Sequence, residues 1–335
     1  MSTFPLRVGI LGCGNISGEY LKGLSQSQSV VHVTACADLL PERARDFSNR
    51  HGIYYMEVDA LLASPEVDIL LNLTPPKVHY STSLVALQNG KHVYSEKPLA
   101  IEFLEGKALL DLAASKGVIV GCAPDTFLGR GLQTCVQTLY NKTIGEPIAA
   151  SAFMVCHGHE DWHPSPDFYY QPGGGPLFDM GPYYLTALVC MLGSIHRVTA
   201  FARPTFKERM VTSDSANPHR IKVDVNTHYT VSLEFKIGVL ATMIMSFDIW
   251  QATLPPIEIY GSEGTLSCPD PNTFDGPVNL IKPKGEVVEI PLVNNAAMGR
   301  GAGLIDMAES IRDGRKPRAS GNLALHVLEA MTAID

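Results

Sequence analysis

The chain has 335 residues, of which 45% are hydrophobic and 18% are charged, so it is long enough for two domains with substantial cores. Its formal net charge is -8 and its lysines and arginines are scattered, which disfavours a nucleic-acid partner because phosphate binding needs a basic stripe. No apolar run approaches the roughly 20 residues of a membrane helix, and the N-terminus lacks an export-signal pattern. We therefore expect a cytoplasmic protein that binds neither nucleic acid nor membrane.

Short β-rich runs alternate with helical segments between residues 6 and 121, a pattern typical of βαβ units and a parallel sheet. The pattern predicts an α/β domain with a doubly wound parallel sheet over residues 1–124. Strands are expected at residues 7–11, 31–37, 69–73, 92–95 and 118–121, and helices at residues 16–24, 41–50, 78–88 and 101–116.

Longer alternating runs follow a helix expected at residues 128–140, and they indicate a large, open, mostly antiparallel sheet. We expect an α+β domain over residues 125–335, with one face of its sheet packed on helices. The free face predicts a homodimer or homotetramer, because such faces often become subunit interfaces. The last helical pattern stops at Asp335, which leaves open whether a short terminal segment follows. Strands are expected at residues 148–156, 225–235, 239–247, 258–260 and 278–281, and helices at residues 302–312 and 323–334.

A glycine-rich turn follows the first predicted strand and opens a helix, the context in which such a turn binds a dinucleotide. Gly12 allows the tight turn, and Gly14 lets the backbone approach a pyrophosphate above the helix N-terminus. Asn15 and Ile16 complete the turn and are expected to contact the cofactor. Ser17 occupies the third small position of the pattern.

The second predicted strand ends at Asp38, where an acidic side chain accepts hydrogen bonds from the adenosine ribose hydroxyls. Leu39 and Leu40 follow and offer no cation for a 2′-phosphate, so the sequence favours NAD over NADP. The alternative for Asp38 is a helix N-cap before Pro41.

The third cofactor signal is a proline-containing loop after the strand at residues 69–73. Ligands of doubly wound folds bind at this carboxyl edge of the sheet. We expect Thr74, Pro75 and His79 to border the dinucleotide. The alternative for His79 is a residue that starts the following helix.

Two further motifs lie downstream, Glu96-Lys97-Pro98-Leu99-Ala100 and Gly173-Gly174-Gly175-Pro176-Leu177-Phe178-Asp179-Met180-Gly181. Together with the glycine turn and Thr74-Pro75-Pro76-x-x-His79, they resemble the Gfo/Idh/MocA oxidoreductases, the family of glucose-fructose oxidoreductase and inositol dehydrogenase. The resemblance extends over nearly the whole chain. It implies an N-terminal Rossmann domain that binds NAD, a C-terminal open sheet used for oligomerisation, and a small-molecule sugar or polyol substrate.

Carried over to this chain, the resemblance makes Glu96 and Lys97 the family's signature pair. Lys97 would bind both the cofactor and the reacting hydroxyl, and would relay the proton of that hydroxyl during hydride transfer. A lysine beside a positive nicotinamide ring should have a lowered pKa, which suits proton transfer near neutral pH. Glu96 would fix this lysine or the cofactor loop, and Pro98 would make that loop rigid.

Asp179 matches the family's acidic residue, which would bind substrate hydroxyls or orient Lys97. Tyr183 stands one helical turn further on, where many relatives carry a catalytic histidine. We expect Tyr183 to bind substrate or relay a proton, with helix packing as the alternative. This departure leaves open which residue is the general acid or base.

The segment 157–164 is dense in polar and aromatic side chains, as a sugar pocket would be. Trp162 is expected against a sugar ring and His163 at a hydroxyl, with ordinary packing as the alternative for both. Asp125 falls where the family often places nicotinamide or substrate contacts. We expect no metal, because the H-x-H-x-x-x-H spacing of this segment is unspecific and the seven cysteines show no C-x-x-C pair.

The leading hypothesis is an NAD-dependent dehydrogenase that moves a hydride from a sugar, polyol or cyclitol hydroxyl, anomeric or secondary, to NAD, with Lys97 as the proton relay. Two alternatives remain. In the first, a tightly held NAD assists elimination or hydrolysis of a glycosidic bond. In the second, the protein senses NAD and binds sugar without catalysis. The sequence does not identify the sugar.

Overall fold

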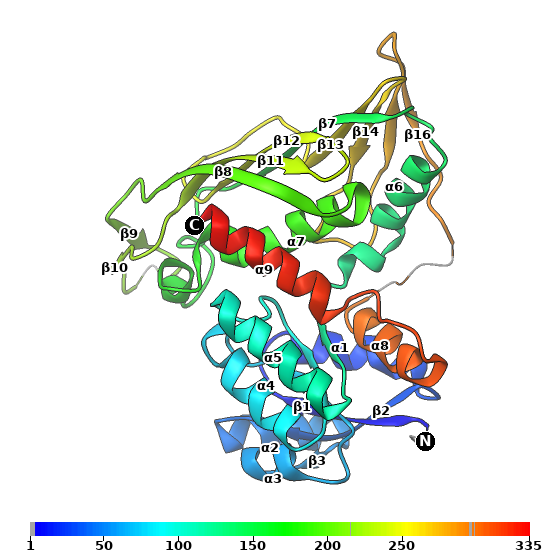
Figure 1. Cartoon of the computed structure of the whole chain (residues 1–335). Helices are drawn as coiled ribbons and strands as arrows, with labels where there is room; N and C mark the ends of the chain where they lie inside the picture. Colours follow the sequence, from blue (N-terminus) through cyan, green and yellow to red (C-terminus); the bar gives the residue numbers. More distant parts are fainter. Residues whose placement is uncertain (1–3, 215, 295–296, 298) are drawn as a thin grey trace. The chain divides into compact units, whose positions relative to one another are not determined.

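The structure is a computed structural model that describes residues 4–214, 216–294, 297 and 299–335 (Figure 1). The chain folds into two compact units. The first unit contains residues 1–128 and 297–328, and the second contains residues 129–296 and 329–335.

A six-stranded parallel sheet forms the centre of the first unit. Its strand order is β3-β2-β1-β4-β5-β6, so the direction of winding reverses between β1 and β4. This confirms the doubly wound Rossmann arrangement expected from the sequence. The strands are β1 (Leu6–Leu11), β2 (Val31–Ala37), β3 (Tyr54–Tyr55), β4 (Ile69–Asn72), β5 (His92–Ser95) and β6 (Val120–Cys122).

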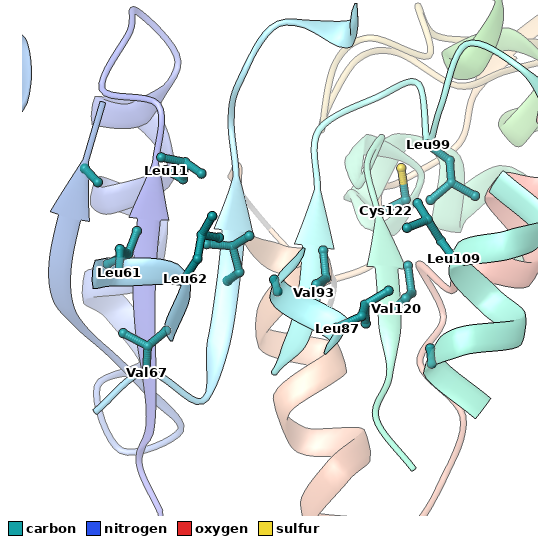
Figure 2. Close-up of a cluster of buried hydrophobic side chains, with 14 of the residues drawn as sticks. Leu11, Leu61, Leu62, Val67, Leu87, Val93, Leu99, Leu109, Val120 and Cys122 are labelled. Atoms are coloured by element: carbon teal, nitrogen blue, oxygen red, sulfur yellow. The ribbon is translucent and has the colours of Figure 1, made fainter. Parts of the chain in front are cut away.

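Helices cover the buried strands because parallel strands present apolar side chains on both faces. All four residues of β4 are buried. The cluster in Figure 2 joins side chains from α3, α4 and α5 to strand residues such as Val93 and Val120. The helices of this unit include α1 (Ser17–Leu24), α2 (Pro41–His51), α3 (Val58–Ala63), α4 (His79–Gln88), α5 (Phe103–Lys116) and α8 (Ala302–Asp313).

Helix α8 packs on the opposite face of this sheet. Tyr94 alternates with Val93 along β5 and therefore points to the other face. A Cβ on Gly303, in α8, would overlap the hydroxyl of Tyr94. The backbone of β6 also bonds to the segment that follows α8, because the Cys122 N–H donates to the Ala319 carbonyl at 3.1 Å.

The sequence places residues 297–328 in the expected domain over residues 125–335, whereas the structure groups them with the first compact unit. These residues return to the first unit, where their glycines allow close approach to the sheet. A sequence pattern shows that a helix forms there but not which sheet it covers.

An eight-stranded sheet with the order β16-β15-β14-β13-β7-β12-β11-β8 dominates the second unit. β7 and β12 pair in parallel and the other neighbours are antiparallel, which confirms the mostly antiparallel sheet. The strands are β7 (Pro147–Val155), β8 (Ile195–Arg203), β11 (His228–Phe235), β12 (Leu240–Ser246), β13 (Ile257–Gly261), β14 (Thr265–Cys268), β15 (Asn279–Ile281) and β16 (Val287–Glu289).

One face of this sheet is covered and the other is exposed. Along β11, Tyr229, Val231 and Leu233 are buried and alternate with more exposed residues. Helix α7 (Gly175–Leu192) packs against β7, β11 and β12. On the outer face, Phe201 pairs with Thr230 across the strands and is 80% exposed. This unit also contains α6 (Arg130–Tyr140), whereas α9 (Gly321–Ile334) begins in the first unit and ends in the second.

A two-stranded ribbon, β9 (Glu208–Val211) and β10 (His219–Lys222), adds a small second core to this unit. Its buried members include Tyr170, from the 3₁₀ turn η4 (Pro166–Tyr170), and Phe247. The sequence pattern does not predict this ribbon. None of the described helices is long and apolar enough to cross a membrane.

The return of residues 297–328 to the first unit is tested at Gly23, on α1. A Cβ there would overlap the carbonyl oxygen of Arg300, whereas a Cβ on Gly18 of the same helix meets nothing within 4 Å. We expect Gly23→Ala to lower the free energy of unfolding by about 1–3 kcal/mol through overpacking. Gly18→Ala is the control and should raise it by about 0.5–1 kcal/mol. Equal effects of the two changes in urea unfolding would contradict this packing.

Candidate functional site

The glycine turn presses directly against the loop that follows β4. Gly12 has a φ of 100°, and a Cβ there would lie 2.6 Å from the carbonyl oxygen of Leu73. Its N–H donates to the Ala37 carbonyl at 2.9 Å, which ties the turn to the end of β2. A side chain at this position is excluded both by the backbone conformation and by the neighbouring strand end.

The space beside Gly14 fits a dinucleotide pyrophosphate. A Cβ on Gly14 would meet nothing within 4 Å, and α1 begins three residues later at Ser17. Asn15 and Ile16 lie between them, and Ile16 is the N-cap residue of α1. Open space before a helix N-terminus is what an anionic pyrophosphate requires.

Asp38 lies at the same edge of the sheet. Its carboxylate accepts the Cys13 N–H at 2.8 Å and the Leu40 N–H at 2.9 Å, so it ties the glycine turn to the start of α2. A carboxylate has lone pairs for about four hydrogen bonds, which leaves capacity for ribose hydroxyls. The guanidinium of Arg43 lies 4.0 Å from this carboxylate. The sequence argument for NAD rested on the absence of a cation at Leu39 and Leu40. It missed Arg43, which stands three residues after Leu40 and reaches Asp38.

His79 is completely buried and holds two loops together. Its Nδ1 lies 2.7 Å from the Pro98 carbonyl oxygen and its Nε2 lies 2.7 Å from the Thr74 carbonyl oxygen. Burial lowers the pKa of His79, and the two carbonyls oppose this effect. Both ring nitrogens of His79 are therefore engaged by backbone, and the expected cofactor contact of His79 stays a prediction. Thr74 and Pro75 remain in the loop that this ring anchors.

The Glu96–Lys97 pair stands directly after β5. Glu96 accepts the Tyr20 hydroxyl at 2.7 Å on Oε1 and the Lys97 N–H at 3.0 Å on Oε2. Its own N–H donates to the Asn72 carbonyl at 2.9 Å. The Lys97–Pro98 peptide bond is cis. Glu96 thus holds the backbone of the loop that carries Lys97, and both side chains are half-buried.

Asp125 is a buried anchor within the first unit. Its Oδ2 accepts the N–H groups of Gly301 at 2.8 Å and Gly303 at 3.3 Å, at the start of α8. Burial raises its pKa to about 6, while Arg300, 3.8 Å away, opposes the rise. The side chain of Asp125 is 0% exposed and bonds to the backbone at the start of α8, and its expected substrate or nicotinamide contact stays a prediction.

In the second unit, Asp179 lies near the start of α7 and beside a histidine. Its Oδ2 is 4.0 Å from Nε2 of His159, whose ring stacks on Tyr169 with centroids 4.0 Å apart. Burial lowers the pKa of His159, and the charge of Asp179 opposes this shift. Tyr183 follows one turn later on α7 and is 6% exposed.

The structure brings Trp162 and His163 to the same aromatic group. The ring centroid of Trp162 is 5.3 Å from that of His159, and that of His163 is 5.4 Å from that of Tyr169. Sequence reasoning named Trp162 and His163 but did not assign His159 to the site. The sequence signal that could have found His159 is its place in the same run of polar and aromatic residues, directly after Gly158.

The buried Arg209 forms ion pairs with residues next to the aromatic side chains of this segment. Arg209, on β9, forms ion pairs with Glu160 and with Asp248, the latter at 3.7 Å. Glu160 also accepts the Tyr170 hydroxyl at 2.7 Å. The described residues contain no group of three or more His, Cys, Asp or Glu side chains arranged to hold a metal ion.

Comparison with known proteins now decides the family. Residues 6–123 match the family model described as oxidoreductase family, NAD-binding Rossmann fold, and residues 132–267 match the GFO/IDH/MocA C-terminal domain. The chain belongs to the GFO/IDH/MocA oxidoreductase family. This confirms the resemblance drawn from the four sequence motifs.

Two proteins similar to this chain carry the names of sugar enzymes. A dTDP-3,4-didehydro-2,6-dideoxy-alpha-D-glucose 3-reductase of Streptomyces violaceoruber is 32% identical over 58% of this chain and 56% of that protein. A D-xylose 1-dehydrogenase (NADP(+)) of Hypocrea jecorina is 25% identical over 95% of this chain and 87% of that protein.

The fold extends to solved structures. An NAD binding oxidoreductase from Klebsiella pneumoniae has a TM-score of 0.83, 20% identity, and coverage of 98% of this chain and 95% of that chain. Among the first curated relatives, however, the matched region spans 39% to 57% of their length.

The buried Asp125 predicts a pH-dependent stability. Its pKa is raised from 3.8 to about 6 on folding, so its contribution to stability is complete below the unfolded pKa and is lost as the pH rises through the folded pKa. Asp125→Asn lacks this titration. We therefore compare the free energy of unfolding of Asp125→Asn with that of the native chain. The difference, variant minus native, should rise by about 1 kcal/mol between about pH 5 and about pH 7.5. A difference independent of pH in urea unfolding would contradict this assignment.

Proposed function

We propose that the chain is an NAD-dependent dehydrogenase that transfers a hydride from a sugar, polyol or cyclitol hydroxyl, anomeric or secondary, to NAD. One observation carries the proposal: the glycine turn, Asp38 and the Glu96–Lys97 loop follow β1, β2 and β5 of one parallel sheet and so meet at its carboxyl edge. Membership of an oxidoreductase family with an NAD-binding Rossmann fold supports it.

The choice of NAD over NADP rests on Asp38. Its carboxylate suits two ribose hydroxyls and repels a 2′-phosphate. Arg43, 4.0 Å from Asp38, is the feature that favours NADP as the second candidate. When bound, the nicotinamide supplies the hydride acceptor, and the residues of the chain bind, orient and move protons around it.

In this reaction Lys97 relays the proton. Its ammonium group donates a hydrogen bond to the substrate oxygen, and its neutral form accepts the hydroxyl proton at Nζ as the hydride leaves carbon. Glu96 positions this loop through its bonds to Tyr20 and to the Lys97 N–H. Asp179 and Tyr183, in the second unit, bind substrate hydroxyls. His159, 4.0 Å from Asp179, orients that carboxylate.

We also propose that copies of the chain associate through the outer face of the eight-stranded sheet. Phe201 on β8 and Leu240 on β12 of this sheet are 80% and 61% exposed. Burying such side chains stabilises a dimer or tetramer at roughly 25 cal/mol per Å² of apolar surface.

Activity is tested by mixing the protein with NAD, and separately with NADP, and a panel of sugars and polyols, and following the absorbance of the reduced cofactor. Lys97→Met is expected to keep cofactor affinity within a few fold and to lower turnover by roughly 10²–10⁴-fold. Lys107→Met is the matched control, because Lys107 is an exposed lysine of the same unit, paired with Asp111 on α5. It should leave turnover unchanged.

Unchanged turnover in Lys97→Met would remove this lysine from the mechanism. Release of an aglycone from a glycoside without net reduction of NAD would replace the dehydrogenase by the glycoside-cleaving alternative.

A further inference from the structure

Three buried charged side chains meet beside the small core of the second unit. Arg209 is 6% exposed, and its guanidinium pairs with Glu160 and lies 3.7 Å from Asp248. The side chains of all three are at most 10% exposed. Taking charges out of water is costly, and well-packed apolar side chains in place of a buried ion pair are often as stable. Stability alone therefore does not account for this cluster.

The β9–β10 ribbon places Arg209 in the cluster. Buried residues alternate with exposed ones along β9, and Arg209 and Val211 are the buried ones. Arg220, on β10, is exposed and pairs with Glu208 at 3.2 Å. The two arginines of the ribbon therefore contact different surroundings, because successive side chains of a strand point to opposite faces.

Arg209 holds the chain on both sides of His159. Its guanidinium donates to the His157 carbonyl at 3.2 Å and pairs with the carboxylate of Glu160. That carboxylate also accepts the Tyr170 hydroxyl at 2.7 Å. One side chain therefore fixes the segment of residues 157–160 at both of its ends.

The ring of His159 is held between side chains of the same surroundings. It stacks on Tyr169 with centroids 4.0 Å apart and meets the Phe247 ring edge-on at 4.6 Å. Arg209 also donates to the Phe247 carbonyl. His159 is 8% exposed and presents Nε2 to the carboxylate of Asp179 at 4.0 Å. The geometry of the His159–Asp179 pair therefore depends on Arg209.

We propose that Arg209 is a positioning residue of the substrate site, which acts through His159 to fix the Asp179 carboxylate that binds substrate hydroxyls. This rests on the proposed function, which assigns Asp179 to the substrate. A misplacement of about 1 Å can cost roughly 100-fold in turnover, so a carboxylate that meets a particular hydroxyl needs rigid support. Arginine suits this role because its planar group donates to several acceptors at once, whereas lysine has a compact ammonium group.

NMR titration of the histidine protons tests the positioning without substrate or cofactor. Burial lowers the pKa of His159, and charged neighbours modify this shift, namely Asp179, Glu160, His163 and Asp161. Arg209→Lys keeps the buried positive charge, so the fold should persist, but the ammonium group reaches fewer acceptors. We expect the His159 ring to become more solvated in this variant and its pKa to rise toward the ordinary value.

Arg220→Lys is the matched control, because Arg220 is an exposed arginine of the same ribbon with a carboxylate partner. It should leave the His159 titration unchanged. His159→Gln identifies the resonance. Asp248→Asn is a second variant, which removes one partner of the Arg209 guanidinium and should shift the His159 titration in the same direction. An unchanged titration in folded Arg209→Lys and Asp248→Asn would overturn the proposal.

Steady-state kinetics with NAD and the panel of sugars and polyols supply the second measurement. In Arg209→Lys we expect kcat/KM for the sugar to fall by roughly 10- to 100-fold with a raised KM. The KM for NAD should stay within about twofold, because Asp179 acts on the sugar. A purely structural defect would reduce the amount of active protein and leave both KM values unchanged.

A double variant shows whether Arg209 acts through His159. Adding Arg209→Lys to His159→Gln should cause little further loss, because two residues that act in series are not additive. Additive losses, or an unchanged KM for the sugar in Arg209→Lys, would overturn the positioning role. A shifted His159 titration in a protein whose native chain oxidises no sugar would support the positioning and contradict the dehydrogenase function, so the two failures are seen separately.

Discussion

The first unit depends on the contact between the glycine turn and the end of β4. Gly12 has no room for a side chain, because Leu73 occupies the place where a Cβ would stand, 2.6 Å away. The reversal of winding between β1 and β4 makes these two strand ends neighbours. Asp38 and Glu96 then bond to backbone on either side of this contact. Loosening the contact would separate the proposed cofactor turn from the loop that carries Lys97.

Several titratable side chains that are natural candidates for chemistry serve the backbone instead. His79 joins two loops through carbonyl oxygens, and Asp125 holds the start of α8. Glu96 fixes the loop of Lys97. In the second unit, Arg209 donates to the His157 carbonyl and pairs with Glu160, so it also fixes backbone beside aromatic side chains. These bonds position side chains that carry the proposed reaction, and each satisfies a buried polar group that would otherwise cost about 1–3 kcal/mol.

The fold was largely accessible from the sequence because buried parallel strands read as apolar runs and their helices carry clear periodicity. The ribbon of β9 and β10 could not be predicted from the sequence, because short, exposed strands lack a clear apolar run. Gly12, Gly14 and Asp38 follow from local spacing. His159 and Arg209 do not, because their roles depend on partners distant in the chain, such as His157, 52 residues from Arg209. The burial of Asp125 likewise depends on a distant segment, since Gly301 is separated from it by 176 residues.

The central claim is that the space beside Gly14 receives the cofactor pyrophosphate, and calorimetric titration of Gly14→Val with NAD tests it most directly. A Cβ at Gly14 meets nothing within 4 Å, so the variant should fold with an unchanged unfolding curve. The account predicts one NAD bound per native chain and a loss of affinity of at least about 100-fold in the variant, because the valine side chain fills the place of the phosphates. Equal NAD affinity of the folded variant and the native chain would contradict it.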